Sequence, residues 1–168
     1  PEGALQLIMG SAKDALNHMQ MQDVVTFTGS ASTGQLLKAH PQIIANAVPF
    51  NLEADSLNAC VLGQDAVPGT PEFDLFIKEV RKEITVKCGQ KCTAIRRIII
   101  PENLCEAVKD ALTKALDQTT IGDPKNEKVR MGALASMSQR DDVKDKLAQL
   151  KAESEIWYEN KANSLIDA

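Results

Sequence analysis

The sequence lacks the features that identify metal-binding, membrane-spanning and secreted proteins. It has only two histidines, both far from the four cysteines, and no Cys-x-x-Cys pair, so we expect no metal site. No apolar run approaches the roughly 20 residues that a membrane-spanning helix needs. The first residues, Pro1–Ala4, have neither the basic nor the apolar region of a secretory signal. We therefore predict a cytoplasmic protein with free thiols, at Cys60, Cys88, Cys92 and Cys105.

An excess of positive charge is also missing. The formal net charge of the 168 residues is −4, and the lysines and arginines are interleaved with acids, which argues against a nucleic-acid-binding surface. Hydrophobic residues make up 43% of the chain and charged residues 25%, so a chain of this length can bury a real core. These properties predict a globular protein whose partners are neither nucleic acid nor membrane.

The segment with the most chemical character is Lys87–Arg96, which reads KCGQKCTAIR. It separates a stretch of helical spacing, residues 72–87, from the β-branched run Ile98–Ile100. Within it, Cys92 follows Gly-Gln and lies among lysines and arginines. Nearby cations lower a thiol's pKa from about 8.5 toward neutrality, and the thiolate is the nucleophilic form. Cys92 is therefore the candidate nucleophile.

A second candidate site precedes it at Val24–Gly34, which reads VVTFTGSASTG. Val24 to Thr28 is β-rich, Ser30 is a good helix N-cap, and residues of helical pattern follow. A strand, a Gly-Ser turn and a helix N-terminus can bind a phosphate, because free N–H groups and the helix dipole both favour an anion. An ordinary capped helix explains the same residues, so this segment alone leaves both interpretations open.

The two segments together resemble the aldehyde dehydrogenase family. Gly89–Cys92 resembles its active-site signature, Gly-Gln-x-Cys, and Phe27–Gly34 resembles the turn that its members set against the cofactor pyrophosphate. The resemblance implies that Cys92 is the nucleophile and that NAD or NADP is the cofactor. The cofactor-binding residues that it implies are Gly29, Ser30 and Gly34.

A third motif, Pro49–Asn58 (PFNLEADSLN), lies where the family normally reads Glu-Leu-Gly-Gly-Lys-Ser-Pro-Asn, whose Glu is the general base. The Leu-Glu pair is retained, but the glycines and the lysine are missing and the spacing to Asn58 is shorter. We assign the base to Glu53, although counting back from Asn58 without a gap places Asn51 there. The Glu-Ala-Asp-Ser-Leu-Asn variant resembles the dehydrogenase part of PaaZ-type bifunctional proteins of phenylacetate degradation, which oxidise a semialdehyde bearing a coenzyme A thioester.

The resemblance implies an oxidoreductase that converts an aldehyde, here a CoA-linked semialdehyde of aromatic-acid degradation, to the acid through a cysteine thioester. Two alternatives stay open. One is a CoA-acylating aldehyde dehydrogenase, which keeps the cysteine and typically lacks the catalytic Glu. The other is a non-catalytic α/β fragment that only packs against a partner. Because the resemblance covers well under half of a usual aldehyde dehydrogenase, we expect this fragment alone to be inactive and the intact protein to be a homo-oligomer.

Strands and helices alternate along the sequence. We expect strands at residues 4–8, 23–28, 45–52, 58–62, 94–100 and 156–158, and helices at 11–21, 30–39, 72–87, 101–116 and 138–152. The alternation predicts an α/β fold with a mainly parallel sheet covered by helices on both faces. The resemblance implies that residues 1–53 form the C-terminal part of an NAD(P)-binding domain, that residues 54–159 form the N-terminal part of the catalytic domain, and that residues 160–168 are a tail.

Overall fold

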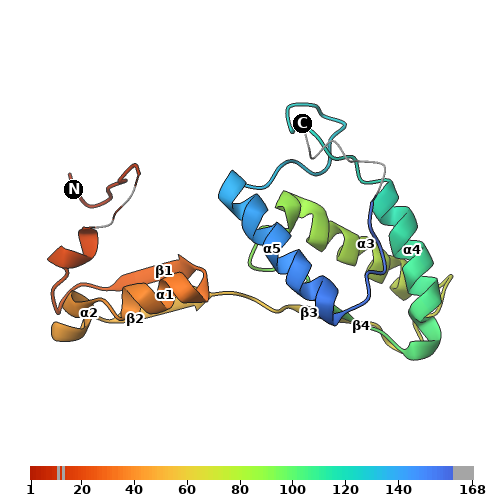
Figure 1. The fold of residues 1–168 in the computed structure, drawn as a ribbon, viewed down its shortest axis with the longest axis horizontal. Coiled ribbons are helices and arrows are strands. Elements are labelled where there is room, and N and C mark those ends of the chain that lie inside the picture. The colour runs from red at the N-terminus through yellow and green to blue at the C-terminus, as the bar shows by residue number, and fades with distance from the viewer. Residues whose placement is uncertain (11, 13, 161–168) are drawn as a thin grey trace. The chain divides into compact units, whose positions relative to one another are not determined.

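The structure is a computed structural model that describes residues 1–10, 12 and 14–160 (Figure 1). The chain divides after Asp55 into two compact units, and each unit contains its own pair of strands. Apart from Asn160, the tail predicted at residues 160–168 lies outside the described residues.

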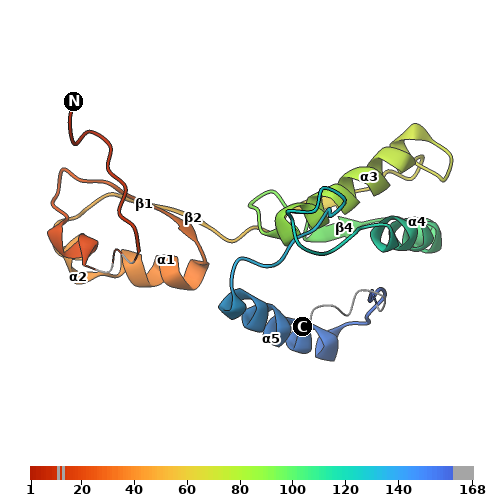
Figure 2. The same cartoon turned by 90° about the horizontal axis from the view of Figure 1, so that it is seen from above.

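The first unit is built on two parallel strands, β1 (Val25–Gly29) and β2 (Phe50–Ala54), which pair in register along their whole length. Helix α1 (Ala31–Lys38) packs against both strands (Figure 2). Alternate residues of each strand are half-buried, as the period of two requires when one face of a strand pair is covered. On the covered face, the Leu52 side chain lies directly against Gly34 of α1.

A short helix, α2 (Pro41–Ala45), precedes β2. Pro41 occupies its first turn, where a fixed φ favours a helix, and the His40 ring accepts a hydrogen bond from the Gln42 N–H at 3.3 Å. Our expectation of a strand over residues 45–52 is therefore wrong in its first part, because these start signals were missed. The strand begins only at Phe50.

The predicted strand at residues 4–8 is also wrong. Leu5 and Leu7 are 93% and 84% exposed, and no described residue pairs with this segment. Apolar residues do not make a strand alone, because backbone N–H and C=O groups need a partner strand. Of the helix expected at 11–21, the described part contains one 3₁₀ turn, η1 (Ala15–His18), and residues 11 and 13 lie outside the description.

The second unit contains the parallel strands β3 (Ala59–Val61) and β4 (Arg97–Ile99) and two helices that pack together, α3 (Pro71–Thr85) and α4 (Cys105–Asp117). Figure 1 shows α3 and α4 side by side. One hydrophobic core joins these elements, and its buried residues are Leu62, Ala66, Phe73, Phe76, Ile77, Val80, Leu104, Val108 and Leu112.

The helices predicted at 30–39, 72–87 and 138–152 are confirmed to within two residues at each end. The helix expected from residue 101 begins later, because a 3₁₀ turn, η3 (Glu102–Leu104), precedes α4. The last helix, α5 (Met137–Glu153), starts after Ser136, whose hydroxyl accepts a hydrogen bond from the Gln139 N–H. Residues 156–158 do not form the expected strand.

Parallel strand pairs joined by helices confirm the α/β class. Among the described residues, the four named strands form two separate pairs instead of one continuous sheet. None of the helices in the described part of the chain is long and apolar enough to cross a membrane.

Candidate active site

The segment that carries Cys92 begins where α3 ends. After Thr85, the short 3₁₀ segment η2 (Val86–Gly89) contains three successive residues of positive φ, Lys87, Cys88 and Gly89. The left-handed region costs a residue other than glycine roughly 1–2 kcal/mol. Such a turn persists only where surrounding contacts hold it, so the contacts of this segment identify what fixes the candidate nucleophile.

Side chains of the motif itself supply these contacts. Arg96 Nη2 donates a hydrogen bond to the Gly89 carbonyl at 2.8 Å. The Gln90 amide donates to the Lys87 carbonyl at 3.0 Å, and its oxygen accepts from the Ala135 N–H at 3.0 Å. The Gly-Gln pair before Lys91 and Cys92 thus has a physical basis, because the glycine takes a left-handed φ and the glutamine joins two backbone segments.

Two of the cations that lie near Cys92 in the sequence, Lys91 and Arg97, have other partners in the structure. Lys91 Nζ lies 2.8 Å from a carboxylate oxygen of Glu83, and these two side chains are only 23% and 19% exposed. Arg97 Nη2 donates to the Leu57 carbonyl at 2.9 Å. The Lys91–Glu83 ion pair therefore anchors the residue before Cys92 to helix α3.

Cys92 lies at the tip of a tight turn. The Ala94 N–H donates to the Lys91 carbonyl at 3.2 Å, which places Cys92 and Thr93 at the two central positions. Cys92 is exposed, whereas Ala94 is fully buried. Cys92 is therefore exposed to solvent at the turn, and the backbone that follows enters the interior at Ala94.

Two residues that the sequence analysis did not assign to the site, Ser56 and Asn58, hold this turn. The Cys92 carbonyl accepts hydrogen bonds from Ser56 Oγ at 2.7 Å and from Asn58 Nδ2 at 2.6 Å. Asn58 Nδ2 also lies 3.2 Å from the Ala94 carbonyl. The available signal was the polar Ser-x-Asn immediately before an apolar strand, but only the β3–β4 pairing shows which residues it meets.

The other thiols are less available than that of Cys92. All four cysteines are free, as predicted, and the other three are partly buried. Burial raises the pKa of the Cys60 and Cys88 thiols above the usual range. The Cys88 thiol also donates to the Gly132 carbonyl at 2.7 Å, a contact that gives it a packing role.

The three predicted cofactor-binding residues lie together in the first unit, at the junction of β1 and α1. Ser30 is the N-cap of α1, and its hydroxyl accepts from the Thr33 N–H at 3.2 Å. A Cβ on Gly34 would come 2.3 Å from Leu52 Cδ1, so this glycine allows α1 to pack closely on β2. Gly29 is the last residue of β1.

A carboxylate lies at the same helix N-terminus. Asp55 follows β2 with a positive φ of 46°, and the Ala31 N–H donates to its Oδ2 at 3.3 Å. An acidic oxygen thus occupies a position from which a phosphate oxygen would accept the same hydrogen bond. The residues present fit the phosphate end of a dinucleotide when the Asp55 side chain moves away from the Ala31 N–H, which is then free to donate to a phosphate oxygen.

Glu53 and Asn51, the two candidates for the general base, are both exposed and lie on the same face of β2. In the strand register, Glu53 is opposite Thr28 and Asn51 is opposite Thr26. Burial and strand face therefore do not separate the two candidates. Both belong to the first unit, whereas Cys92 belongs to the second.

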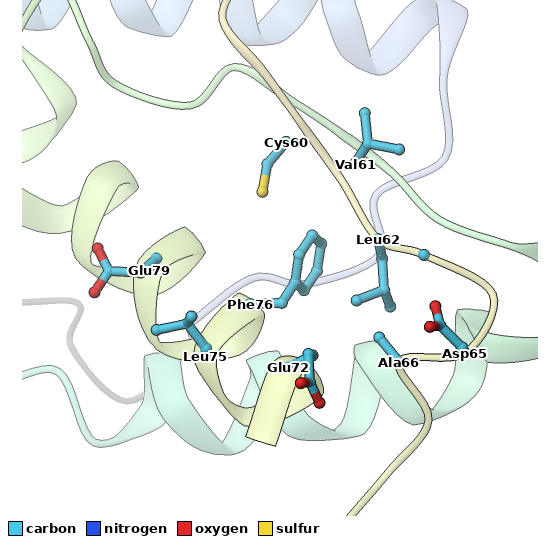
Figure 3. Close-up of a pocket in the computed structure, with 10 residues that line it drawn as sticks. Cys60, Val61, Leu62, Asp65, Ala66, Glu72, Leu75, Phe76 and Glu79 are labelled. Atoms are coloured by element: carbon cyan, nitrogen blue, oxygen red, sulfur yellow. The ribbon is translucent and has the colours of Figure 1, made fainter. Parts of the chain in front are cut away.

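A surface pocket of about 390 Å³ lies between the end of β3 and one face of α3 (Figure 3). The Cys60 thiol, the Phe76 ring and three carboxylates line it, those of Asp65, Glu72 and Glu79. None of the predicted site residues belongs to it. In the described part of the chain, no group of three or more His, Cys, Asp or Glu side chains is placed to hold a metal ion.

Comparison with known proteins identifies relatives that match most of the chain. The model of the aldehyde dehydrogenase family matches residues 1–164. A 3,4-dehydroadipyl-CoA semialdehyde dehydrogenase from Aromatoleum evansii is 47% identical over 158 residues, which is 94% of this chain and 31% of that protein. An alpha-ketoglutaric semialdehyde dehydrogenase from Bacillus subtilis is 29% identical over 144 residues, 84% of this chain and 28% of that protein. The chain spans less than a third of the length of both relatives.

Solved structures share the fold. The betaine aldehyde dehydrogenase of Staphylococcus aureus in complex with NAD⁺ superposes with a TM-score of 0.71 at 23% identity, over 79% of this chain and 25% of that chain. The gamma-glutamyl-gamma-aminobutyraldehyde dehydrogenase of Burkholderia cenocepacia superposes with a TM-score of 0.67 at 23% identity, over 77% of this chain and 25% of that chain. At this level of identity, the likeness establishes the fold and nothing finer.

Proposed function

Because the chain belongs to the aldehyde dehydrogenase family, we propose that the whole protein oxidises an aldehyde with NAD or NADP through a thioester on Cys92. The observation that carries the proposal is the exposed Cys92 thiol at the tip of a turn anchored on both sides. The other three cysteines are partly buried, so they are less suited to meet a substrate.

The reaction follows from the groups available. The Cys92 thiolate attacks the aldehyde carbon and forms a C–S bond, and the carbonyl oxygen becomes an oxyanion that the Cys92 N–H can stabilise. NAD or NADP, when bound, supplies the acceptor for the hydride that leaves this carbon. Glu53 then takes a proton from water, and the resulting hydroxide displaces the Cys92 thiolate from the thioester to release the acid. A placed carboxylate base typically contributes about 10²–10⁴-fold to such a step.

We assign the base to Glu53 because the Pro49–Asn58 segment keeps the Leu-Glu pair of the motif in which the family carries its general base. We further propose that residues 1–53 belong to the NAD(P)-binding domain and residues 54–159 to the catalytic domain. Gly29, Ser30 and Gly34 would hold the cofactor pyrophosphate.

The proposed substrate is a semialdehyde linked to coenzyme A. Support comes from the Glu53–Asn58 sequence and from the relative that shares 47% identity, whose name specifies such a substrate. A small aldehyde without the CoA group would then be a poor substrate, because it would lose the binding energy that the CoA group contributes at a distance from the reacting carbon.

The test is a rapid-mixing experiment on the full-length protein with Glu53→Gln and, as the matched control, Asn51→Ala. Glu53→Gln should give a burst of reduced cofactor of about one equivalent per site with almost no steady state, because the thioester forms and is not hydrolysed. Asn51→Ala should turn over normally, and the reverse result would show that the alignment of the Pro49–Asn58 motif, and with it the assignment of the base to Glu53, is wrong. A wild-type enzyme that turns over only when free coenzyme A is added would be an acylating dehydrogenase instead.

A further inference from the structure

The Cys92 carbonyl has an unusual set of partners for the tip of an exposed turn. Two side chains from a segment 34–36 residues earlier donate to it, Ser56 Oγ at 2.7 Å and Asn58 Nδ2 at 2.6 Å. A carbonyl at such a position ordinarily bonds to water and leaves the turn free to change its conformation. Here the peptide plane that joins Cys92 to Thr93 is fixed from outside the turn.

Asn58 is itself held rigidly, because its carbonyl accepts hydrogen bonds from the Arg96 N–H at 2.9 Å and the Arg97 N–H at 3.1 Å. It immediately precedes β3, which pairs with β4 along the edge that follows the Cys92 turn. The two hydrogens of its amide nitrogen face the carbonyl oxygens of Cys92 and Ala94. The Asn58 side chain therefore links the two carbonyls, and a side chain with a single hydrogen to donate could not do so.

The two sides of Cys92 are therefore anchored independently. The residue before it is bound through the Lys91–Glu83 ion pair, and its own carbonyl is bound by Ser56 and Asn58. The thiol between these anchors is left exposed. This combination fixes the backbone of a reactive group without burying its side chain.

We propose that Ser56 and Asn58 are positioning residues that hold the backbone of Cys92 in the conformation from which its thiolate attacks and its N–H meets the oxyanion. The proposal rests on the proposed function of Cys92 as nucleophile. Neither residue touches the reacting atoms, so their effect is on geometry. A misplacement of about 1 Å can cost about 10²-fold in rate even when the chemical groups are intact.

The prediction is a loss in the chemical step without a loss in cofactor binding. In the full-length protein, Asn58→Ala should slow the burst of reduced cofactor about tenfold or more, and its amplitude should stay near one per site. Ser56→Ala should have a smaller effect, because Asn58 still donates to the same oxygen. The double variant should lose more than the product of the two single effects, because neither residue is then left to compensate for the other at this oxygen.

Two nearly isosteric variants of Ser56 separate the effect of its hydroxyl group on the burst rate from the effect of side-chain volume. Ser56→Thr and Ser56→Val add similar volume to the same half-buried position, but only threonine can donate to the Cys92 carbonyl. Threonine should restore most of the burst rate, and valine should not. Equal burst rates in these two variants would overturn the proposal. Asn126→Ala, which removes an asparagine whose side chain accepts from the nearby Lys128 N–H, is the control and should leave the rate unchanged.

A second measurement does not depend on aldehyde oxidation. Hydrogen exchange, followed by mass spectrometry of peptides that cover residues 91–97, should be faster in Asn58→Ala and Ser56→Val than in the wild type and Ser56→Thr. Faster exchange with an unchanged burst rate would overturn the positioning role. A wild-type protein that forms no reduced cofactor from the aldehyde with either NAD or NADP would refute the proposed function, and the exchange data would still show whether these side chains hold the turn.

Discussion

The carboxylate of Asp55 provides a sharp test of the proposed cofactor site. It accepts a hydrogen bond from the Ala31 N–H at the start of α1, where a cofactor phosphate would have to accept the same bond. Asp55→Asn removes the charge and keeps an oxygen that can accept from this N–H. It also suits the backbone, because Asn is among the residues that best tolerate the positive φ of 46° seen here.

The expected effect can be estimated from Coulomb's law. A phosphate oxygen that competes for the Ala31 N–H would lie about 4 Å from Asp55 Oδ2, and two unit charges at this distance repel by about 1 kcal/mol in water. Asp55 is exposed, so the value for water is the appropriate one. One kcal/mol corresponds to a factor of about five in the dissociation constant. Asp55→Asn should therefore bind NAD or NADP about fivefold more tightly.

The assay is calorimetric titration of the full-length protein with each cofactor at two salt concentrations. Asp55→Asn should tighten binding at low salt, and the gain should shrink at high salt as the charges are screened. Asp23→Asn is the control, because it removes the same charge from another turn of the first unit. Unchanged or weaker binding by Asp55→Asn would refute the placement of the phosphate at α1.

Three further outcomes are expected. Iodoacetamide near neutral pH should label Cys92 before Cys60 and Cys88, because burial raises the pKa of those two thiols and so lowers their thiolate fraction. The labelling rates of Cys60 and Cys88 should rise toward that of Cys92 as the pH increases. Equal labelling rates for all four cysteines at pH 7 would contradict this prediction. Gly89→Ala should destabilise the Cys92 segment by about 1–2 kcal/mol, because Gly89 has a φ of 69° and a Cβ at this position would lie 3.2 Å from the Ile84 carbonyl oxygen. In a denaturant titration, Gly89→Ala should lower the free energy of unfolding more than Gly89→Asn does. The 168-residue chain alone should not bind NAD or NADP at micromolar strength, because one phosphate site does not offset the roughly 4–15 kcal/mol lost on association. Its unpaired strand edges should give dimers or larger species in light scattering. A monodisperse monomer that binds either cofactor would contradict both expectations.

Elements whose signals are local were predictable from the sequence. Helix α3 is an example, because Thr70 caps it, Pro71 occupies its first turn, and Phe73 and Val80 recur at helical spacing and are buried. Strand β1 and helix α1 were predictable for the same reason, since β-branched residues lead into the capping serine at residue 30. In each case the information lies within one or two turns of chain.

Features that depend on a partner were not predictable in this way. Residues 4–8 have strand-like composition and form no strand, because a strand exists only when another strand pairs with it. The cations near Cys92 in the sequence are the surroundings typical of a reactive thiol, but in the structure Lys91 meets Glu83 and Arg96 meets the Gly89 carbonyl. A long flexible side chain can reach several neighbouring groups, and the sequence does not show which of them it binds.

The sequence by itself determined the order of most elements, the choice of Cys92 as the candidate nucleophile and the family that its motifs resemble, because each depends on contiguous residues. Only the tertiary structure decided what holds that cysteine. Ser56 and Asn58 are separated from Cys92 by more than thirty residues, and they reach its carbonyl because β3 and β4 pair in parallel and bring the ends of two distant segments to one edge. Such a contact depends on the pairing register, which is set by the packing of the whole unit and not by the residues on either side of the bond.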